Sequence, residues 1–198
     1  MYPKSLQQLI DSFKLFPGIG DKTAERMAFA LMDMEEEMTE VFSNSILNVK
    51  KNIRHCSICN NLTDAEICNI CSNKDRDNKS LCVVEDPKSV FLFEKLGIYN
   101  GKYHVLKGLI SPLDGINPED IELEKLIERV KKEELKELIL AFKPSIEGET
   151  TALYIKRILG DMNLSITKIA SGIPMGADME YIDAMTLERA LLDRKSVD

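Results

Sequence analysis

Four cysteines, Cys56, Cys59, Cys68 and Cys71, constrain this chain more than any other feature of its sequence. They form two C-x-x-C pairs with eight residues between the pairs. Each C-x-x-C turn presents two thiolates to one point, and a second turn completes the tetrahedron of sulfur ligands that zinc prefers, at about 2.3 Å per Zn–S bond. The loop between the pairs carries too few large apolar residues to fold without such a staple. The spacing therefore predicts one structural zinc site, with no open position for chemistry.

Two other interpretations of these cysteines are a pair of disulfides and a set of four unrelated thiols. Both are disfavoured, because the N-terminal residues lack the basic and apolar regions of a secretory signal and because paired C-x-x-C motifs are a poor disulfide framework. His55 adjoins Cys56, and sequence neighbours seldom share one tetrahedral metal, so we expect it to be a bystander. Cys82 opens an apolar run and is expected to be a buried free thiol.

The length and composition favour a soluble protein with one large domain or two to three small ones. The chain has 198 residues, 44% of them hydrophobic and 30% charged, with a net charge of −7. No apolar run approaches the ~20 residues that a membrane helix needs, so no membrane partner is expected. We expect a cytoplasmic protein, associated with the nucleoid where it binds DNA. The acidic total argues against a nonspecific polyanion binder, although it leaves room for a local basic face.

The first part of the chain predicts two helices joined by a tight hairpin. Pro17 fixes one backbone angle, while Gly18 and Gly20 allow conformations that other residues avoid and let another backbone approach closely. Lys22 and Arg26 lie four residues apart and project together from the second helix. The backbone amides at the start of that helix form a natural phosphate seat beside these cations. The pattern predicts DNA-backbone binding without base readout, the alternative being an ordinary two-helix turn with a solvated charged face.

A third helix is expected to follow, with one apolar stripe along its length. The stripe consists of Met38, Val41, Phe42, Ile46, Val49 and Ile53. Lys50, Lys51 and Arg54 end this segment. Cations suit a helix C-terminus in any case, so this trio fits a helix-end role and a second DNA contact equally well.

From residue 80 onward, short apolar runs alternate with helical patterns. The alternation implies a largely parallel sheet covered on both faces. The polar stretch 72–80 is the expected joint between the finger and this α/β domain. His104 lies within an apolar strand and is expected to be structural. The expected strands are 81–84, 103–106, 138–142 and 164–170, and the later expected helices are 118–132, 147–159 and 182–192.

Acidic residues stand at the carboxyl ends of the expected strands, where functional groups gather in parallel sheets. If several of these carboxylates converge, their oxygens suit Mg²⁺. The alternative is that they are solvated or face a partner. The residues are Glu85, Asp86, Glu147 and Glu149.

The order of these features resembles the bacterial RecR family of recombination mediators, nearly from end to end. The resemblance implies an α/β multi-domain fold, with a helical helix-hairpin-helix domain (1–54), a four-cysteine zinc finger (55–72), a Toprim domain (80–171) and a C-terminal helical segment (172–198). Its specific stretches are Phe16-Pro17-Gly18-Ile19-Gly20 with Lys22 and Arg26, the four cysteines, Glu85-Asp86-Pro87, and residues 103–106, 110–115, 147–154 and 172–181.

The resemblance also bears on catalysis. In catalytic Toprim proteins a glutamate ends the first strand, which Glu85 matches, and an Asp-x-Asp pair ends a later strand. Here the later strand ends in Phe-Lys-Pro-Ser (142–145), and a lysine near the expected metal position disfavours two-metal strand cleavage. The resemblance therefore implies a protein without enzymatic activity.

The function implied by the family is a DNA clamp and adaptor in recombinational repair. Family subunits assemble as dimers and ring tetramers around single- or double-stranded DNA, and they act with RecO and RecF to load recombinase at gapped DNA. Glu85 and Asp86 are implied in the RecO contact. A ring would gather several copies of Lys22 and Arg26, offsetting the acidic charge of one subunit.

Two rival functions stay open from the sequence. One is a Mg²⁺-dependent nuclease or primase-like enzyme of the Toprim class, built on the acidic residues at the strand ends. The other is a zinc-stapled interaction module with no role on DNA.

Overall fold

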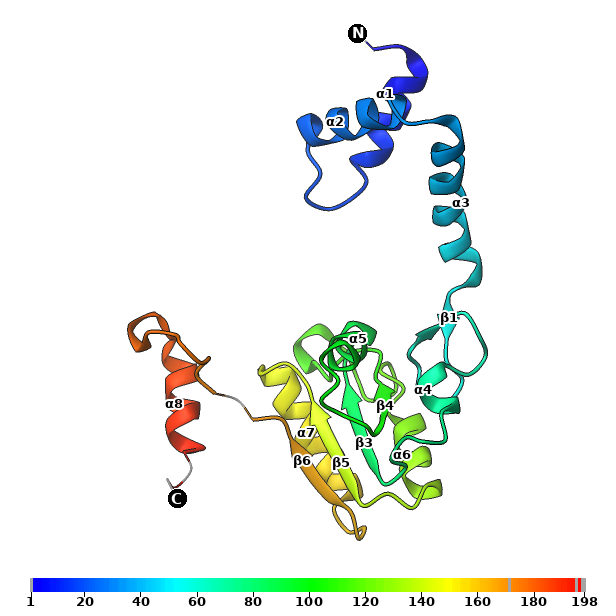
Figure 1. The fold of residues 1–198 in the computed structure, drawn as a ribbon. Helices are drawn as coiled ribbons and strands as arrows, with labels where there is room; N and C mark the ends of the chain where they lie inside the picture. Colours follow the sequence, from blue (N-terminus) through cyan, green and yellow to red (C-terminus); the bar gives the residue numbers. More distant parts are fainter. Residues whose placement is uncertain (1, 171, 195, 197–198) are drawn as a thin grey trace. The chain divides into compact units, whose positions relative to one another are not determined.

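The computed structural model describes residues 2–170, 172–194 and 196, and it divides into two compact units, Met1–Ile53 and Arg54–Asp198. The first unit holds the helices α1 (Lys4–Phe13), α2 (Asp21–Met32) and α3 (Glu36–Asn52) (Figure 1). The helices α1 and α2 pack on a small core in which two alanines of α2 allow the helices to approach closely. This core consists of Leu6, Ile10, Phe13, Ala24 and Ala28.

The helix α3 is present as expected, but its apolar stripe is exposed. Within the described residues, α3 buries none of its side chains. The stripe therefore supplies no core to the unit, and a contiguous apolar surface of this kind commonly marks an interaction site. The exposed members include Met38, Val41, Phe42, Ile46, Val49 and Ile53.

The second unit contains the finger and a four-stranded parallel sheet. The finger is formed by an antiparallel pair, β1 (Arg54–His55) and β2 (Leu62–Thr63), and the short helix α4 (Asn69–Ser72). The sheet has the strand order β4-β3-β5-β6, and all three pairings are parallel. Its strands are β3 (Ser80–Val84), β4 (Lys102–Val105), β5 (Glu137–Ala141) and β6 (Ser165–Lys168).

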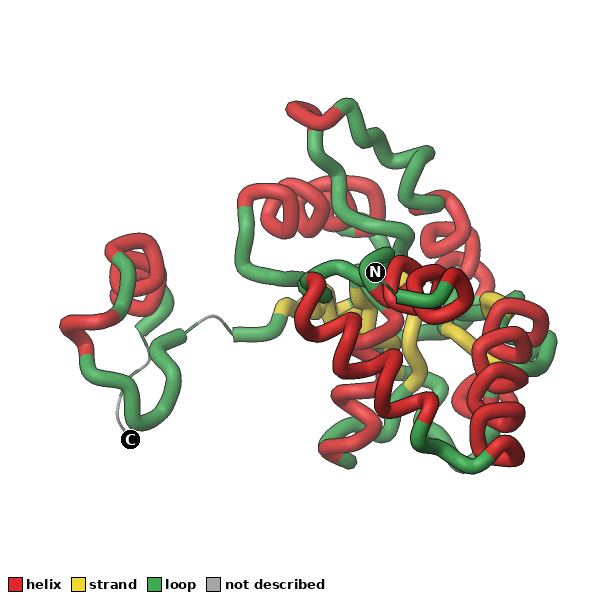
Figure 2. Tube along the Cα trace, turned by 90° about the horizontal axis from the view of Figure 1, so that it is seen from above, coloured by secondary structure: helices red, strands yellow, loops and turns green. Residues whose placement is uncertain are grey.

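Helices cover both faces of this sheet, as the alternating pattern predicts (Figure 1, Figure 2). One face packs against α6 (Leu123–Lys132) and α7 (Ile146–Leu159), and the other against α5 (Pro87–Leu96). Successive side chains of a strand point to opposite faces. Leu81 and Val83 accordingly enter the first core, whereas Cys82 and Val84 enter the second.

The chain reverses its direction of winding beside β3. From β3 it passes through α5 to β4, and then through α6 to β5 on the other side of β3. Ligands and partners of parallel sheets bind at such a switch point, beyond the carboxyl ends of the strands. Here the backbone N–H of Lys143, after β5, donates a hydrogen bond to Oε2 of Glu85, after β3, at 3.2 Å.

The helix expected at 118–132 is shorter than predicted, since it begins at Leu123. Glu122 has a left-handed backbone with φ of 54°, which a helix cannot continue through. Before it, the side chain of Asp120 accepts a hydrogen bond from the Asn117 backbone N–H at 2.8 Å, closing a local turn. Hydrophobic periodicity does not reveal such a turn.

The last helix, α8 (Ala184–Leu192), begins two residues later than predicted. Its start is set by Asp183, whose carboxylate accepts from the backbone N–H of Thr186 at 2.9 Å. Short 3₁₀ turns lie at Pro112–Asp114 and Met179–Tyr181. Among the residues that the structure describes, none of the helices has the length and apolar character to span a bilayer.

The stretch 72–80, the expected joint between the finger and the sheet domain, contacts the sheet domain through Arg76. Arg76 is paired with the carboxylate of Glu94 on α5, and its Nη1 also donates to the carbonyl of Gly101 at 3.1 Å. The hydroxyl of Tyr103 donates to the same carboxylate at 2.9 Å. The finger and the sheet therefore belong to one compact unit.

A prediction concerns Gly148, in the first turn of α7. A Cβ added there would stand 2.3 Å from the carbonyl oxygen of Lys143, a backbone atom that cannot swing away. We expect Gly148→Ala to lower the free energy of unfolding by about 1–3 kcal/mol. Thermal unfolding measures this, with a Tm change of about 2–4 °C for each kcal/mol.

The matched control is Gly172→Ala, because a Cβ at Gly172 meets no atom within 4 Å. An unchanged Tm for Gly148→Ala would show that the close approach of α7 to the end of β5 is not required.

Candidate metal centre and nucleic-acid interface

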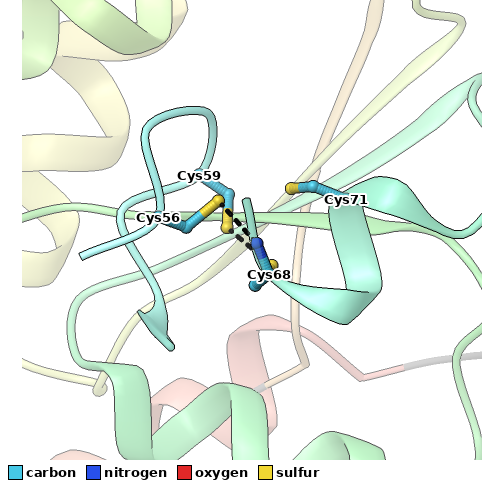
Figure 3. A group of neighbouring side chains, drawn as sticks. All are labelled: Cys56, Cys59, Cys68 and Cys71. Carbon is cyan, nitrogen blue, oxygen red and sulfur yellow. Dashed lines mark hydrogen bonds between the residues drawn. The ribbon is translucent and has the colours of Figure 1, made fainter. Parts of the chain in front are cut away.

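The four cysteine sulfurs predicted to bind metal come together in the finger. Their Sγ atoms all lie within 4.8 Å of one another, and Sγ of Cys59 is 3.5 Å from Sγ of Cys68. Figure 3 shows Cys71, from α4, directing its sulfur toward the other three. A tetrahedron of Zn–S bonds places its sulfurs ~3.8 Å apart, so the cluster has the size that a metal requires. All five cysteines of the chain are free of disulfides.

The thiols of the cluster act on one another. Hydrogen bonds from Cys59 and then Cys71 lower the pKa of Cys68. The hydrogen bonds with Cys68 and Cys71, together with burial, raise the pKa of Cys59. The thiolate is the form of cysteine that binds a metal, so a bound cation would stabilise that form in this cluster. The donor set fits a structural metal ion.

His55, expected to be a bystander, lies outside the cluster. It is exposed, and its Nδ1 is hydrogen-bonded to the carbonyl of Asn60 at 2.9 Å. His104 is buried in β4, and burial lowers its pKa to about 3, which agrees with a structural role. Cys82 is the buried free thiol that the apolar run predicts, and burial raises its pKa to about 12.

The predicted hairpin lies between α1 and α2. The backbone N–H of Ile19 donates to the carbonyl of Phe16 at 3.2 Å, and Gly18 has φ of 81°, a conformation that favours glycine. Gly20, the N-cap of α2, has an ordinary φ of −91°. A Cβ at either glycine would meet no non-neighbouring atom within 4 Å, so the space beside the hairpin is open.

The start of α2 leaves its backbone donors available. Ala24 is the first residue whose N–H bonds back into the helix, to the carbonyl of Gly20 at 2.9 Å. No side chain caps the helix at Gly20. The preceding amides of the first turn therefore have no helical partner, and they carry the positive end of the helix dipole.

The start of α2 carries the two cations Lys22 and Arg26 and the two acids Asp21 and Glu25. Asp21 pairs with Lys14 at 2.6 Å, and that hydrogen bond lowers the pKa of Asp21. Lys22 and Arg26 are both exposed, and within the described part of the chain neither forms an ion pair. The structure thus brings Gly18, Gly20 and the two predicted cations to one short stretch.

The second basic group, Lys50, Lys51 and Arg54, is also exposed. Lys50 and Lys51 lie in the last turn of α3, where cations oppose the negative end of the helix dipole. A helix-terminal role accounts for these two lysines without a ligand.

At the sheet's switch point, Glu85 and Asp86 are half-buried. Besides the bond from Lys143 to Glu85, Oδ1 of Asp86 accepts from the backbone N–H of Lys88 at 2.7 Å and so caps α5. Oδ2 of Asp86 also lies 3.9 Å from Nζ of Lys88, so Oε1 of Glu85 is the carboxylate oxygen of this pair without a described contact.

The other two acids are engaged elsewhere. Glu149 forms ion pairs with Lys168 at 2.7 Å and Arg189 at 3.3 Å, and the hydrogen bond from Lys168 lowers the pKa of Glu149. A hydrogen bond with Ser145 lowers the pKa of Glu147. Among the described residues, the four-cysteine cluster is the one set of three or more potential metal-ligand side chains whose ligand atoms gather at one point. The acids do not converge as a Mg²⁺ site requires.

Sequence reasoning missed one residue of the finger, Asn60. Its φ is 63°, and its Nδ2 donates to the carbonyl of Val105 in β4 at 3.1 Å. An Asn directly after a C-x-x-C pair is a signal of a left-handed backbone position, but its partner lies 45 residues away and is invisible to local patterns.

Comparison with known proteins matches the whole order of elements. Family models match a RecR helix-hairpin-helix at residues 6–50, a RecR four-cysteine zinc finger domain at 53–73, a Toprim domain at 79–170 and a RecR C-terminal region at 172–195. Each structural part described above thus has a counterpart in that family.

Two relatives are similar over nearly the full length. The proteins named Recombination protein RecR from Staphylococcus saprophyticus and from Staphylococcus haemolyticus are each 48% identical to this chain over 193 residues, which is 98% of this chain and 98% of theirs. The chain belongs to the RecR family of recombination proteins.

Proposed function

We propose that this protein is a nonenzymatic DNA clamp and adaptor of recombinational repair, and that the hairpin between α1 and α2 is its DNA contact. The observation that carries this proposal is the uncapped start of α2 beside Lys22 and Arg26, which form no ion pair in the described part of the chain. Free amides, a helix dipole and two cations together form a seat for a phosphate group.

The two glycines of the hairpin also support a DNA contact there. Gly18 is required by its positive φ, but neither φ nor internal packing requires a glycine at position 20. An absent side chain in open space suits the close approach of another molecule's backbone. Contacts to phosphates position a protein on DNA without reading its bases, so gapped, single-stranded and double-stranded DNA all fit this seat.

Self-association would raise the affinity for DNA by linking several of these contacts. One subunit offers two cations against a net charge of −7, so a single phosphate seat binds weakly. A dimer or ring tetramer multiplies the seats, and linked sites gain affinity without new contacts. The exposed apolar stripe of α3, and the helix α8, which buries none of its described side chains, supply surfaces for such assembly.

The acidic edge at the switch point is the proposed partner contact. Glu85 accepts from Lys143 through one oxygen, which leaves its other oxygen for a basic partner, while Asp86 caps α5 and pairs at 3.9 Å with the exposed Lys88, which such a partner could displace. We assign this contact to RecO, which with RecF would place recombinase on gapped DNA in the nucleoid. Strand cleavage is not assigned, because Glu149 is paired with two cations and the described acids form no convergent oxygen site for Mg²⁺.

The proposed metal in the finger is zinc, held by Cys56, Cys59, Cys68 and Cys71. Four thiolates leave no open position, so its role is structural. We expect Cys68→Ser to lose the metal and to lower Tm. Cys82→Ala serves as the matched control, since Cys82 is buried outside the cluster and its removal leaves the four ligands in place.

Elemental analysis and thermal unfolding of the purified full chain measure both effects. Metal near one equivalent in the Cys68→Ser protein, with an unchanged Tm, would contradict the assignment of Cys68 as a ligand.

The DNA contact is tested by the double variant Lys22→Ala, Arg26→Ala. We expect the DNA affinity to fall on the order of tenfold at moderate salt. The salt dependence should weaken by about 0.9 in log–log slope for each phosphate that the variant no longer neutralises. Fluorescence anisotropy with a labelled gapped duplex, over a range of salt concentrations, measures both quantities.

The charge-matched control is Lys131→Ala, Lys132→Ala, which removes two lysines from the last turn of α6. Glu85→Ala is a second control and should retain DNA binding. Equal decreases in affinity for the α2 and α6 variants would mean that total charge, and not the hairpin, sets the affinity.

A further inference from the structure

We infer that the metal-loaded finger caps the outer edge of the parallel sheet at strand β4, and that metal loss exposes this edge at Val105. The inference goes beyond DNA binding and rests on the proposed metal occupancy. It assigns the finger a task on the sheet domain, carried by hydrogen bonds between the two.

The strand β4 lies at one end of the sheet, with β3 on a single side. The backbone N–H of Leu106 donates to the carbonyl of Val84 at 2.9 Å, so the hydrogen-bonding groups of residue 106 face β3. These groups alternate along a strand, and those of Tyr103 and Val105 therefore face outward. An outer edge with free donors and acceptors is a template for another strand.

The finger occupies this outer edge at Val105. The N–H of Val105 donates to the carbonyl of Cys59 at 2.8 Å, and the carbonyl of Val105 accepts from Nδ2 of Asn60 at 3.1 Å. Both outward groups of one β4 residue are thus satisfied by two consecutive finger residues. Ile70, of α4, also packs against the core that contains Tyr103 and Val105.

A second element closes the edge at Tyr103. Nη1 of the buried Arg129, on α6, donates to the carbonyl of Tyr103 at 2.7 Å, and its Nε donates to Glu133 at 2.9 Å. This contact belongs to the sheet domain itself. Metal loss should therefore release Val105 and leave the Tyr103 contact in place.

The cap depends on the metal because its two contacts come from the ligand turn. Cys59 is itself a predicted ligand, and Asn60 follows it with a left-handed φ of 63°. The core of the finger consists of its cysteines and Ile70, so it is small. Without a cation, the turn that aligns Cys59 and Asn60 with β4 loses the metal–sulfur bonds that hold it in place.

The first test compares the full chain with its metal and after removal of the metal by a chelator. In the metal-free protein, we expect the amide hydrogen of Val105 to exchange on the order of a hundredfold faster, while the β5 amides of Leu138 and Leu140 stay protected. Full protection of Val105 in metal-free protein, or simultaneous loss of β5 protection, would overturn the inference.

The second test keeps the metal and weakens the cap. Asn60→Gly preserves the left-handed backbone and all four cysteines, and it removes the donor to the Val105 carbonyl. We expect an unchanged metal content and roughly fivefold faster exchange at Val105. The control is Asn73→Gly, because the Asn73 side chain accepts from the nearby Asp75 N–H at 2.8 Å and lies outside the contact with β4. Equal exchange at Val105 in both variants and the parent protein would overturn the edge-cap role, whether or not zinc is the metal.

Discussion

The structure of the finger depends on gathering four thiols within 4.8 Å of one another. A cation stabilises such a cluster by binding the thiolates. The finger has too little apolar surface to fold without that interaction. Because Cys59 and Asn60 then reach across to Val105, a local metal-binding turn is connected to the edge of a distant parallel sheet. The binding of one metal ion would thereby stabilise both the finger and the β4 edge of the sheet.

The chain separates its charges by function. The cations Lys22 and Arg26 stand at an uncapped helix start in the first unit, whereas Glu85 and Asp86 stand at the switch point of the sheet in the second. In the proposed function, this separation would reconcile a net charge of −7 with binding to a polyanion, since the attraction would be local to the hairpin and the acidic surface would be left for a basic partner. The exposed apolar stripe of α3 fits the same proposal, because self-association through it would strengthen a DNA contact that is weak in one subunit.

Sequence patterns predicted those features that depend on residues close together in the sequence. The C-x-x-C spacing indicated the cysteine cluster, the glycines of the hairpin indicated its turn, and alternating apolar runs indicated the four parallel strands. The early helix start at 118 was wrong, because a left-handed Glu122 and an Asp120 turn interrupt the pattern. Periodicity found the stripe of α3 but not its exposure, and no pattern foresaw the contact of Asn60 with β4 or the pairing of Glu149 with Lys168, since both join residues distant in sequence.

The central claim is that free amides at the start of α2 hold a phosphate, and Gly20→Asp tests it most directly. Asp is a favoured N-cap, Gly20 already has an N-cap backbone, and a Cβ there meets no atom within 4 Å, so the fold should be at least as stable. Its carboxylate would occupy the amides and repel DNA. The account predicts an unchanged or higher Tm together with a loss of DNA affinity that the equally charged Gly172→Asp does not show. DNA affinity equal to that of the parent protein in Gly20→Asp would contradict the account.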